Sequence, residues 1–238
     1  MSVLPALDEK AEYVERMFSR IAPGYDRMNR VMTFGLDQRW RRRVVEQVAP
    51  PVGGRALDVG TGTGDFLLEL AAWAREGIVV GVDCTVPMMA AGRGKLAHLE
   101  GKRAAFVGGD ALRLPFPDNT FDAITTGFVL RNVTDIPQAL GEMYRVARPG
   151  GVMACLEVAR PKHALVRLGH RLYFEGVVPW IGQIIGGDRQ AYTYLPQSAR
   201  AFPSPARLAA MMGEAGWRHV TYRLLSLGAV AIHVGAKI

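Results

Sequence analysis

Cysteine and long apolar runs are both scarce in this chain of 238 residues. The two cysteines, Cys84 and Cys155, are too few for a disulfide scaffold and lack the spacing of a metal site, so a reducing compartment is expected. No uncharged apolar stretch reaches about 18 residues, which argues against a membrane span. Charged residues already stand at positions 8–10, before a secretory apolar segment can form. These absences predict a soluble cytoplasmic protein that binds no metal.

Lysine is scarce too, because arginine supplies most of the 29 basic side chains and of the net charge of +7. A basic balance suits nucleic acid, an anionic membrane surface or an acidic ligand, and it also merely keeps a surface solvated. The densest cluster lies at residues 39–43, where four arginines flank Trp40. These arginines cannot share one narrow helix face, so a solvated helix surface is favoured over a contact with lipid phosphates.

Length and an apolar content of 49% predict one domain with a buried core. We expect an N-terminal helical lid over residues 1–50 and a cofactor-binding core over 55–158. A segment that covers the substrate is expected over 159–203, and a C-terminal helix and hairpin over 204–238. Prolines and glycines at positions 50–54 mark the first boundary.

Short apolar runs alternate with helical stretches from residue 55 onward, which is typical of a parallel sheet covered on both faces. The pattern predicts strands at 56–59, 78–82, 104–107, 121–126 and 152–158. Helices are expected between them, over 65–76, 86–99 and 136–147.

The two ends of the chain have other rhythms. A helix capped by Asp8 is expected over 10–20, then a break at 21–29 caused by Pro23 and Gly24, then a helix over 37–48. Residues 159–203 are expected to be irregular, with helical pieces. A helix from about 204 to 216 precedes two β-type runs, 219–227 and 229–236, which predict an antiparallel pair at a sheet edge.

The strongest chemical signal is the run ALDVGTGTGD at residues 56–65. A strand ends there, Gly60, Gly62 and Gly64 follow at alternate positions, and a helix begins. Glycines let the backbone approach a ligand closely, and the helix N-terminus favours negative charge. Such a loop suits a pyrophosphate or another nucleoside cofactor, although its spacing departs from the dinucleotide pattern G-x-G-x-x-G.

Acidic residues decide between those cofactors. Asp83 follows the second strand, 25 residues after Asp58, and Asp110 follows the third strand, so both belong to the carboxyl edge of the sheet. With Asp65, these acids repel a pyrophosphate and suit the cationic S-adenosylmethionine rather than NAD. Asp58 and Asp65 also fit a plain capping role.

These motifs resemble class I S-adenosylmethionine-dependent methyltransferases, in which the sheet is Rossmann-like and mostly parallel, with helices on both faces and a C-terminal antiparallel hairpin. Further motifs across nearly the whole chain are similar to one family, the quinone C-methyltransferases that methylate demethylmenaquinol or a polyprenyl benzoquinol. They are MFSRIAPGYDRMN (17–29), FGLDQRWRR (34–42), LRNVTD (130–135) with MYRVARPGG after it, and YTYLPQS (192–198).

The resemblance implies a set of cofactor-binding residues. Asp83 is expected to hold the ribose hydroxyls, and Asp110 the adenine amino group. The other expected contacts are Asp58, Gly60, Gly62, Thr63 and Ala111. Gly127 and Ala159 stand where the family often has serine, so two contacts of the family are absent.

The expected reaction methylates a ring carbon of a reduced quinone, which needs the donor and the ring held in line. The resemblance places Arg131 and Asn132 near the quinol, with a water as proton acceptor, and Tyr25 in the lid as a positioning residue. Arginine stays protonated, so stabilising a forming phenolate is its better role. Arg131 also fits an ion pair, and Tyr25 also fits a packing role.

The expected partner is a polyprenyl quinol, with demethylmenaquinol favoured over the benzoquinol. Apolar residues over 165–187 suit a prenyl groove, a contact with the inner face of the membrane, or plain core. A homodimer is a further expectation, and nucleic acid is not expected, because residues 126–128 lack the motif of amino-methylating enzymes. A scaffold that binds quinones without turnover is disfavoured by the intact glycine loop.

Overall fold

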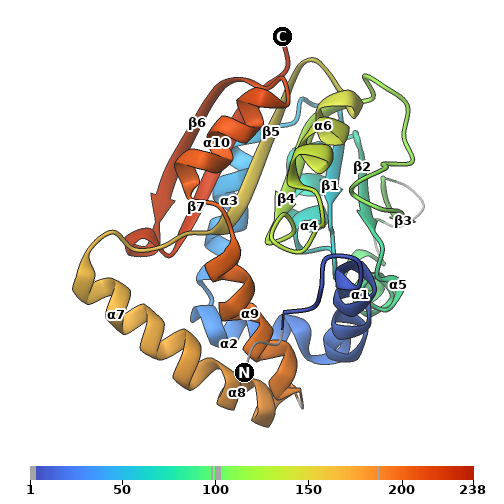
Figure 1. Ribbon diagram of the computed structural model, residues 1–238. Helices are drawn as coiled ribbons and strands as arrows, with labels where there is room; N and C mark the ends of the chain where they lie inside the picture. The colour runs from blue at the N-terminus through green and yellow to red at the C-terminus, as the bar shows by residue number, and fades with distance from the viewer. Residues whose placement is uncertain (1–3, 98, 100–102, 187) are drawn as a thin grey trace.

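The computed structural model describes residues 4–97, 99, 103–186 and 188–238 (Figure 1). Within this part of the chain, seven strands form one sheet in the order β3-β2-β1-β4-β5-β7-β6. The first five are parallel: β1 (Arg55–Val59), β2 (Ile78–Asp83), β3 (Ala104–Gly108), β4 (Phe121–Gly127) and β5 (Ala147–Val158). β7 (Val230–Ala236) pairs antiparallel with β5, and β6 (Arg218–Leu225) pairs antiparallel with β7 at the edge, as predicted.

Helices cover both faces of the sheet, because strand residues alternate between two cores. On one face Leu57 packs with α6 (Ile136–Val146) and α10 (Pro205–Glu214), and on the other Ala56 packs with α3 (Leu36–Val48) and α4 (Asp65–Trp73). The predicted Rossmann-like fold is confirmed. The helix α4 ends at Trp73, three residues before the predicted end, and α5 covers Val86–Leu96. The helix α5 was predicted to end at residue 99, three residues after its observed end at Leu96, and residue 98 lies outside the described residues.

The N-terminal segment differs from its prediction in two places. The helix α1 (Lys10–Ile21) is preceded by Glu9, whose side chain makes no cap, so the cap predicted at Asp8 is wrong. A short 3-10 turn at Ala22–Gly24 leads directly into α2 (Tyr25–Thr33), where a break was predicted. Pro23 is tolerated because it stands in the first turn, where its missing N–H is not needed.

The segment after β5 is far more regular than predicted. It forms α7 (Ala164–Leu172), a π turn (Tyr173–Val177), α8 (Val178–Gly186) and α9 (Arg189–Ala201), with Pro196 inside α9. A third core holds the π turn, α8 and α9 to α1 and α2, and it includes Val178, Tyr192 and Met28, whereas α7 has no buried residue. Tertiary packing therefore overrides the local signals of proline and glycine. Among the described residues, no helix combines the length and apolar character that crossing a bilayer requires.

The arginine-rich helix α3 is only partly a solvated surface. Arg41 is buried and donates from Nη1 to Asp37 Oδ2 at 2.6 Å, and the buried Trp40 donates from Nε1 to Ser226 Oγ at 3.0 Å. Arg39, Arg42 and Arg43 are exposed, as expected for the whole cluster.

Candidate active site

Two cavities lie at the carboxyl edge of the parallel strands, where this class of sheet binds ligands. The smaller cavity has a volume of about 270 Å³ and lies against the ends of β1, β2 and β4. The larger cavity has a volume of about 690 Å³ and lies among α2, α7 and α9. Phe18, Tyr25 and Phe128 line both cavities, so they form a wall between the two.

The smaller cavity brings together most of the predicted cofactor residues. Its lining includes Gly60, Gly62, Asp83, Asp110 and Ala111. Two residues predicted as catalytic, Tyr25 and Asn132, lie on the same walls. The residues predicted from the glycine loop, the two acids and the segment after β4 therefore share one site.

The glycine loop folds over the end of β2. Gly60 and Gly62 have φ of +69° and +55°, a left-handed conformation that glycine adopts without a steric cost. The amide of Gly60 donates to Val82 O at 2.8 Å, and that of Gly62 donates to Asp83 Oδ2 at 2.8 Å. The backbone of the loop is thus fixed against the strand that carries Asp83.

Asp83 keeps capacity to bind a ligand. Burial raises the pKa of its carboxyl, and N–H donors from Thr85 and Gly62 oppose that rise. Its Oδ2 accepts from the amide of Gly62 and its Oδ1 from the amide of Thr85, each at 2.8 Å, and the residue lies on the cavity wall, where a ligand hydroxyl can reach it. A site that presents acceptors beside apolar walls such as Met88 fits the hydroxyls and amino groups of S-adenosylmethionine.

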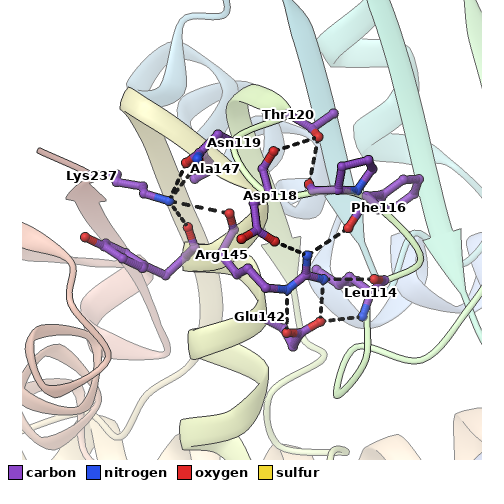
Figure 2. A network of polar contacts seen from close by, with 11 residues as sticks. Leu114, Phe116, Asp118, Asn119, Thr120, Glu142, Arg145, Ala147 and Lys237 are labelled. Carbon is purple, nitrogen blue, oxygen red and sulfur yellow. Dashed lines mark hydrogen bonds and ion pairs between the residues drawn. The ribbon is translucent and has the colours of Figure 1, made fainter.

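Asp110 lies on an exposed segment that α6 holds in place. Its Oδ1 accepts from the amide of Leu112 at 2.9 Å. Figure 2 shows how Arg145 and Glu142 on α6 grip the chain beyond it: Arg145 donates to the carbonyls of Leu114 and Phe116, and Glu142 accepts from the amide of Leu114. This α6 clamp (Glu142 and Arg145) fixes the wall that contains Asp110 and Ala111.

Two predicted cofactor residues, Asp58 and Thr63, do not line either cavity. Asp58 lies beneath the loop and accepts from Thr125 Oγ1 at 2.8 Å, and burial raises its pKa to about 7. Thr63 is buried and donates to Asp26 Oδ1 at 2.5 Å, while Lys95 Nζ donates to Thr63 Oγ1 at 3.0 Å.

Asp65 faces cations rather than a ligand. Lys95 Nζ lies 2.6 Å from its Oδ1, and Arg41 lies 3.7 Å from its Oδ2, so Arg41 and Lys95 keep its pKa low although burial acts the other way. Of the four acids that indicated a cationic cofactor, Asp83 and Asp110 therefore line the cavity. Asp83 and Asp110 are therefore the two acids that can favour a cationic cofactor in the cavity.

The larger cavity is mostly apolar and carries the predicted Arg131 on its wall. The guanidinium of Arg131 lies over the ring of Phe128, 5.6 Å from its centroid. Its Nε and Nη1 are buried without a hydrogen-bond partner among the described residues, and its charge acts on the buried carboxyl of Glu157. A cation with free N–H donors beside an apolar cavity is suited to an oxyanion that forms there.

Asn132 is held between the two cavities. Its Nδ2 donates to the carbonyl of Phe128 at 3.0 Å, and Tyr194 OH donates to its Oδ1 at 3.2 Å. Tyr194 lines the larger cavity, whereas Asn132 lines the smaller. Asn132 therefore links the walls of both.

Two residues of the shared wall, Phe18 and Phe128, were not predicted. Phe18 packs edge-on against Tyr25, with centroids 6.0 Å apart. Phe128 has φ of +61°, an uncommon conformation for a bulky residue and one that concentrates at functional sites. The left-handed backbone of Phe128 is visible only in the structure, because nothing in the local sequence predicts it.

Gly127 also has a structural reason. A Cβ at this position would lie 2.5 Å from Cε2 of Phe66, so the ring of Phe66 fills the space that a serine side chain would need. In this chain Phe66 of α4 therefore packs where the serine that is common in the family would place its side chain.

Known proteins resemble this chain over nearly its whole length. A model of the ubiE/COQ5 methyltransferase family matches residues 6–237. Demethylmenaquinone methyltransferase of Roseiflexus castenholzii is 64% identical and covers 99% of this chain and 98% of its own, and that of Thermus thermophilus is 48% identical and covers 93% and 100%.

Solved structures share the fold. A SAM-dependent methyltransferase from Thermotoga maritima matches with a TM-score of 0.67 at 22% identity, over 94% of this chain and 99% of its own. Phosphoethanolamine N-methyltransferase 2 of Haemonchus contortus, in complex with S-adenosyl-L-methionine, matches with a TM-score of 0.61 at 13% identity, over 84% and 52%. At these identities the likeness shows the fold alone.

Proposed function

The chain belongs to the ubiE/COQ5 methyltransferase family, and from that premise we propose that it methylates a ring carbon of demethylmenaquinol to give menaquinol. The enzyme is a methyltransferase that uses S-adenosylmethionine. The observation that carries the proposal is the wall of Phe18, Tyr25 and Phe128, because it separates an acidic, glycine-lined cavity from an apolar one. A methyl donor on one side and a prenylated ring on the other would meet at that wall.

We propose that the smaller cavity holds the cofactor. Asp83 would accept hydrogen bonds from the ribose hydroxyls, and Asp110 would accept from the adenine amino group. Gly60, Gly62 and Ala111 would supply backbone and close packing, whereas Asp58 and Thr63 would support the loop from beneath. When bound, S-adenosylmethionine supplies the methyl group on a positively charged sulfur that leaves with the bonding electrons.

The chain's own residues would do the rest of the work in the larger cavity. Loss of the proton from a ring hydroxyl places negative charge on that oxygen and makes the neighbouring ring carbon nucleophilic. This carbon takes the methyl group while the charge leaves the oxygen, and the hydrogen on the methylated carbon then leaves as a proton, which we assign to a water, so that the ring becomes aromatic again and the oxygen a hydroxyl. Arg131 would stabilise the ring oxygen and would not act as a base, since a guanidinium stays protonated. Tyr25 and Asn132 would orient the ring at the wall and keep other water away.

The N-terminal helices act as a lid in this proposal. Ala11, Val14, Glu15 and Phe18 of α1 line the smaller cavity, and Lys10 Nζ donates to the carbonyl of Val133 at 2.6 Å. Residues 159–203 would cover the quinol, since α7 and α9 line the larger cavity. Contact with a membrane surface is part of the proposal because a polyprenyl tail resides in a bilayer, and a homodimer stays a prediction.

The test is an anaerobic assay with labelled S-adenosylmethionine and chemically reduced prenyl naphthoquinol or prenyl benzoquinol. We expect label in the naphthoquinol. Arg131→Ala should lower kcat by roughly 10²- to 10³-fold, which is typical when an oxyanion loses a donor, and it should leave the Kd of the cofactor unchanged. Arg16→Ala, which removes an exposed ion pair on α1, is the matched control.

Label in the benzoquinol alone would replace the substrate. No label in either quinol, with the cofactor still bound, would overturn the proposed reaction. Full activity in Arg131→Ala would remove Arg131 from the mechanism.

A further inference from the structure

An apolar stripe runs along the outer side of α7. Leu165, Leu168 and Leu172 are spaced i, i+3, i+7, so they share one helix face. Leu165 is 74% exposed and Leu172 is 60% exposed, and no residue of α7 is buried against the described part of the chain. A helix of a soluble protein normally buries such a face, so this one is shaped for something outside the chain.

The stripe continues past the π turn onto α8. Val177, Trp180 and Ile184 repeat the spacing i, i+3, i+7, and Ile184 is 80% exposed. A π turn holds an extra residue, which brings this second set toward the side of the first. Figure 1 shows α7 and α8 following one another along one border of the molecule. The opposite side of α8 is buried, because Val178 packs in the third core.

Charge beside the α7 part of the stripe is of one sign. Residues 159–174 contain Arg160, Lys162, Arg167 and Arg171 and no acidic residue, and the next residue, the exposed Glu175, is paired with Arg200. A helix with leucines on one face and arginines beside them is the pattern of helices that lie in a membrane interface, where the cations meet anionic headgroups. The basic charge calls for an anionic partner, and the exposed leucine face beside it favours a lipid surface, into which apolar side chains can insert.

The larger cavity lies directly behind this surface. Arg167, Arg171 and Phe174 line it from α7 and the π turn, while the leucines of α7 face away from it. Phe34, which is exposed, packs against Tyr173 with centroids 5.7 Å apart and lines the same cavity. One helix thus separates the apolar cavity from the outer stripe.

We propose that the outer stripe (Leu165, Leu168, Leu172, Val177, Trp180 and Ile184) docks on an anionic phospholipid bilayer, so that a prenyl tail passes from the bilayer under α7 into the larger cavity. The passage of the tail rests on the proposed function, whereas the docking does not. Leucines and Trp180 enter the boundary of the acyl chains, and Arg167 and Arg171 meet lipid phosphates.

The test is co-sedimentation of the full chain with vesicles of phosphatidylglycerol and phosphatidylcholine, without cofactor or quinol. We expect binding to these vesicles and at least tenfold weaker partition for Leu165→Ser/Leu172→Ser, because each buried leucine is lost from the membrane. Val52→Ser/Ile238→Ser is the matched control: both residues are exposed, at 70% and 74%, and they lie just before β1 and just after the antiparallel β7, at the end of the sheet opposite the cavities. It should bind as the wild type does.

Two further readouts separate the outcomes. Arg167→Gln/Arg171→Gln should lose binding to the anionic vesicles, and turnover of a short-chain quinol by Leu165→Ser/Leu172→Ser should equal that of the wild type, which shows that the variant folds. Equal partition of wild type and leucine variant would overturn the docking proposal. So would a dimer in sedimentation velocity that the leucine variant dissociates, without vesicle binding. Vesicle binding without methyl transfer would overturn the proposed function alone.

Discussion

Glu157 and Asp58 are fully buried carboxyls near the ends of β5 and β1, the strands on either side of β4, and each has a raised pKa. Glu157 accepts from the amide of Leu130 at 2.8 Å, next to Arg131. Burial raises the pKa of Glu157 to about 7, although the charge of Arg131 and nearby N–H groups oppose the rise. The folded protein therefore holds this proton more tightly than the unfolded chain does.

The consequence is a pH dependence of stability. Between about pH 4.5 and about pH 7 the folded state binds more protons at Glu157, so the free energy of unfolding falls as the pH rises through that window. Glu157→Gln cannot titrate, so its stability relative to wild type should improve by on the order of 3 kcal/mol across the window. Urea unfolding at a series of pH values measures this, with the exposed Glu214→Gln as control. Parallel curves for wild type and Glu157→Gln would contradict the assignment.

Residue roles could be predicted from the sequence where local pattern decides them. Asp83, Asp110 and the loop glycines end up on the cavity wall because each follows a strand of a parallel sheet, and that edge is common to all such strands. Asp58 and Thr63 belong to the same segment but line neither cavity. Asp58 accepts a hydrogen bond from Thr125, and Thr63 donates one to Asp26. Sequence position does not say on which side of a loop a side chain lies. The sequence also did not predict the left-handed backbone of Phe128, because a bulky residue rarely adopts that conformation.

At the scale of elements, the α6 clamp joins a helix to the wall of the cofactor cavity. Arg145 Nη2 donates to Leu114 O at 3.0 Å and Nη1 to Phe116 O at 2.8 Å, while Glu142 fixes the other side of the guanidinium (Figure 2). These bonds add to the packing of Leu114 in the core and of Phe116 against Phe121 of β4, so α6 is one of the supports that hold the segment with Asp110 in place.

Arg145→Ala should therefore loosen the cofactor wall without touching the quinol cavity. We expect the Kd of S-adenosylmethionine to rise by about tenfold, which corresponds to the loss of one or two net hydrogen bonds, and the KM of the quinol to stay unchanged. Isothermal titration calorimetry and steady-state kinetics measure the two. Arg207→Ala, which removes an exposed ion pair to Glu214 on α10, should change neither. A rise in the quinol KM equal to the rise in Kd would mean general destabilisation instead.

Elements of the sheet were predictable because their signals are local. Strands β1 to β4 match their predicted runs to within one residue at each end, whereas β5 begins at Ala147, five residues before its predicted start. Ser204 caps α10 by accepting from the amide of Arg207. The helix α2 was not predicted because Pro23 and Gly24 disfavour helix locally, and α9 continues through Pro196 where only irregular structure with helical pieces was predicted. Burial of Met28 and Tyr192 in the third core decides the outcome there, and that core exists only in the folded chain.

At the scale of the whole molecule, the motifs that carried the family resemblance converge in space. The segments 17–29, 130–135 and 192–198 come from different parts of the chain, yet residues of each line the two cavities. The third core gathers the first and last of them. The motifs of the family resemblance are therefore residues of one site that forms only in the folded chain. This explains why the resemblance predicted the function, whereas local sequence patterns did not predict all the helices around the site.

A crystal structure with S-adenosylhomocysteine and a demethylated prenyl naphthoquinone tests the central claim most directly. The account predicts the nucleoside in the smaller cavity with its ribose on Asp83, and the ring in the larger cavity beside Arg131. The sulfur and the ring carbon should face each other at the wall of Phe18, Tyr25 and Phe128. A ring bound away from that wall, or a nucleoside outside the smaller cavity, would contradict the account.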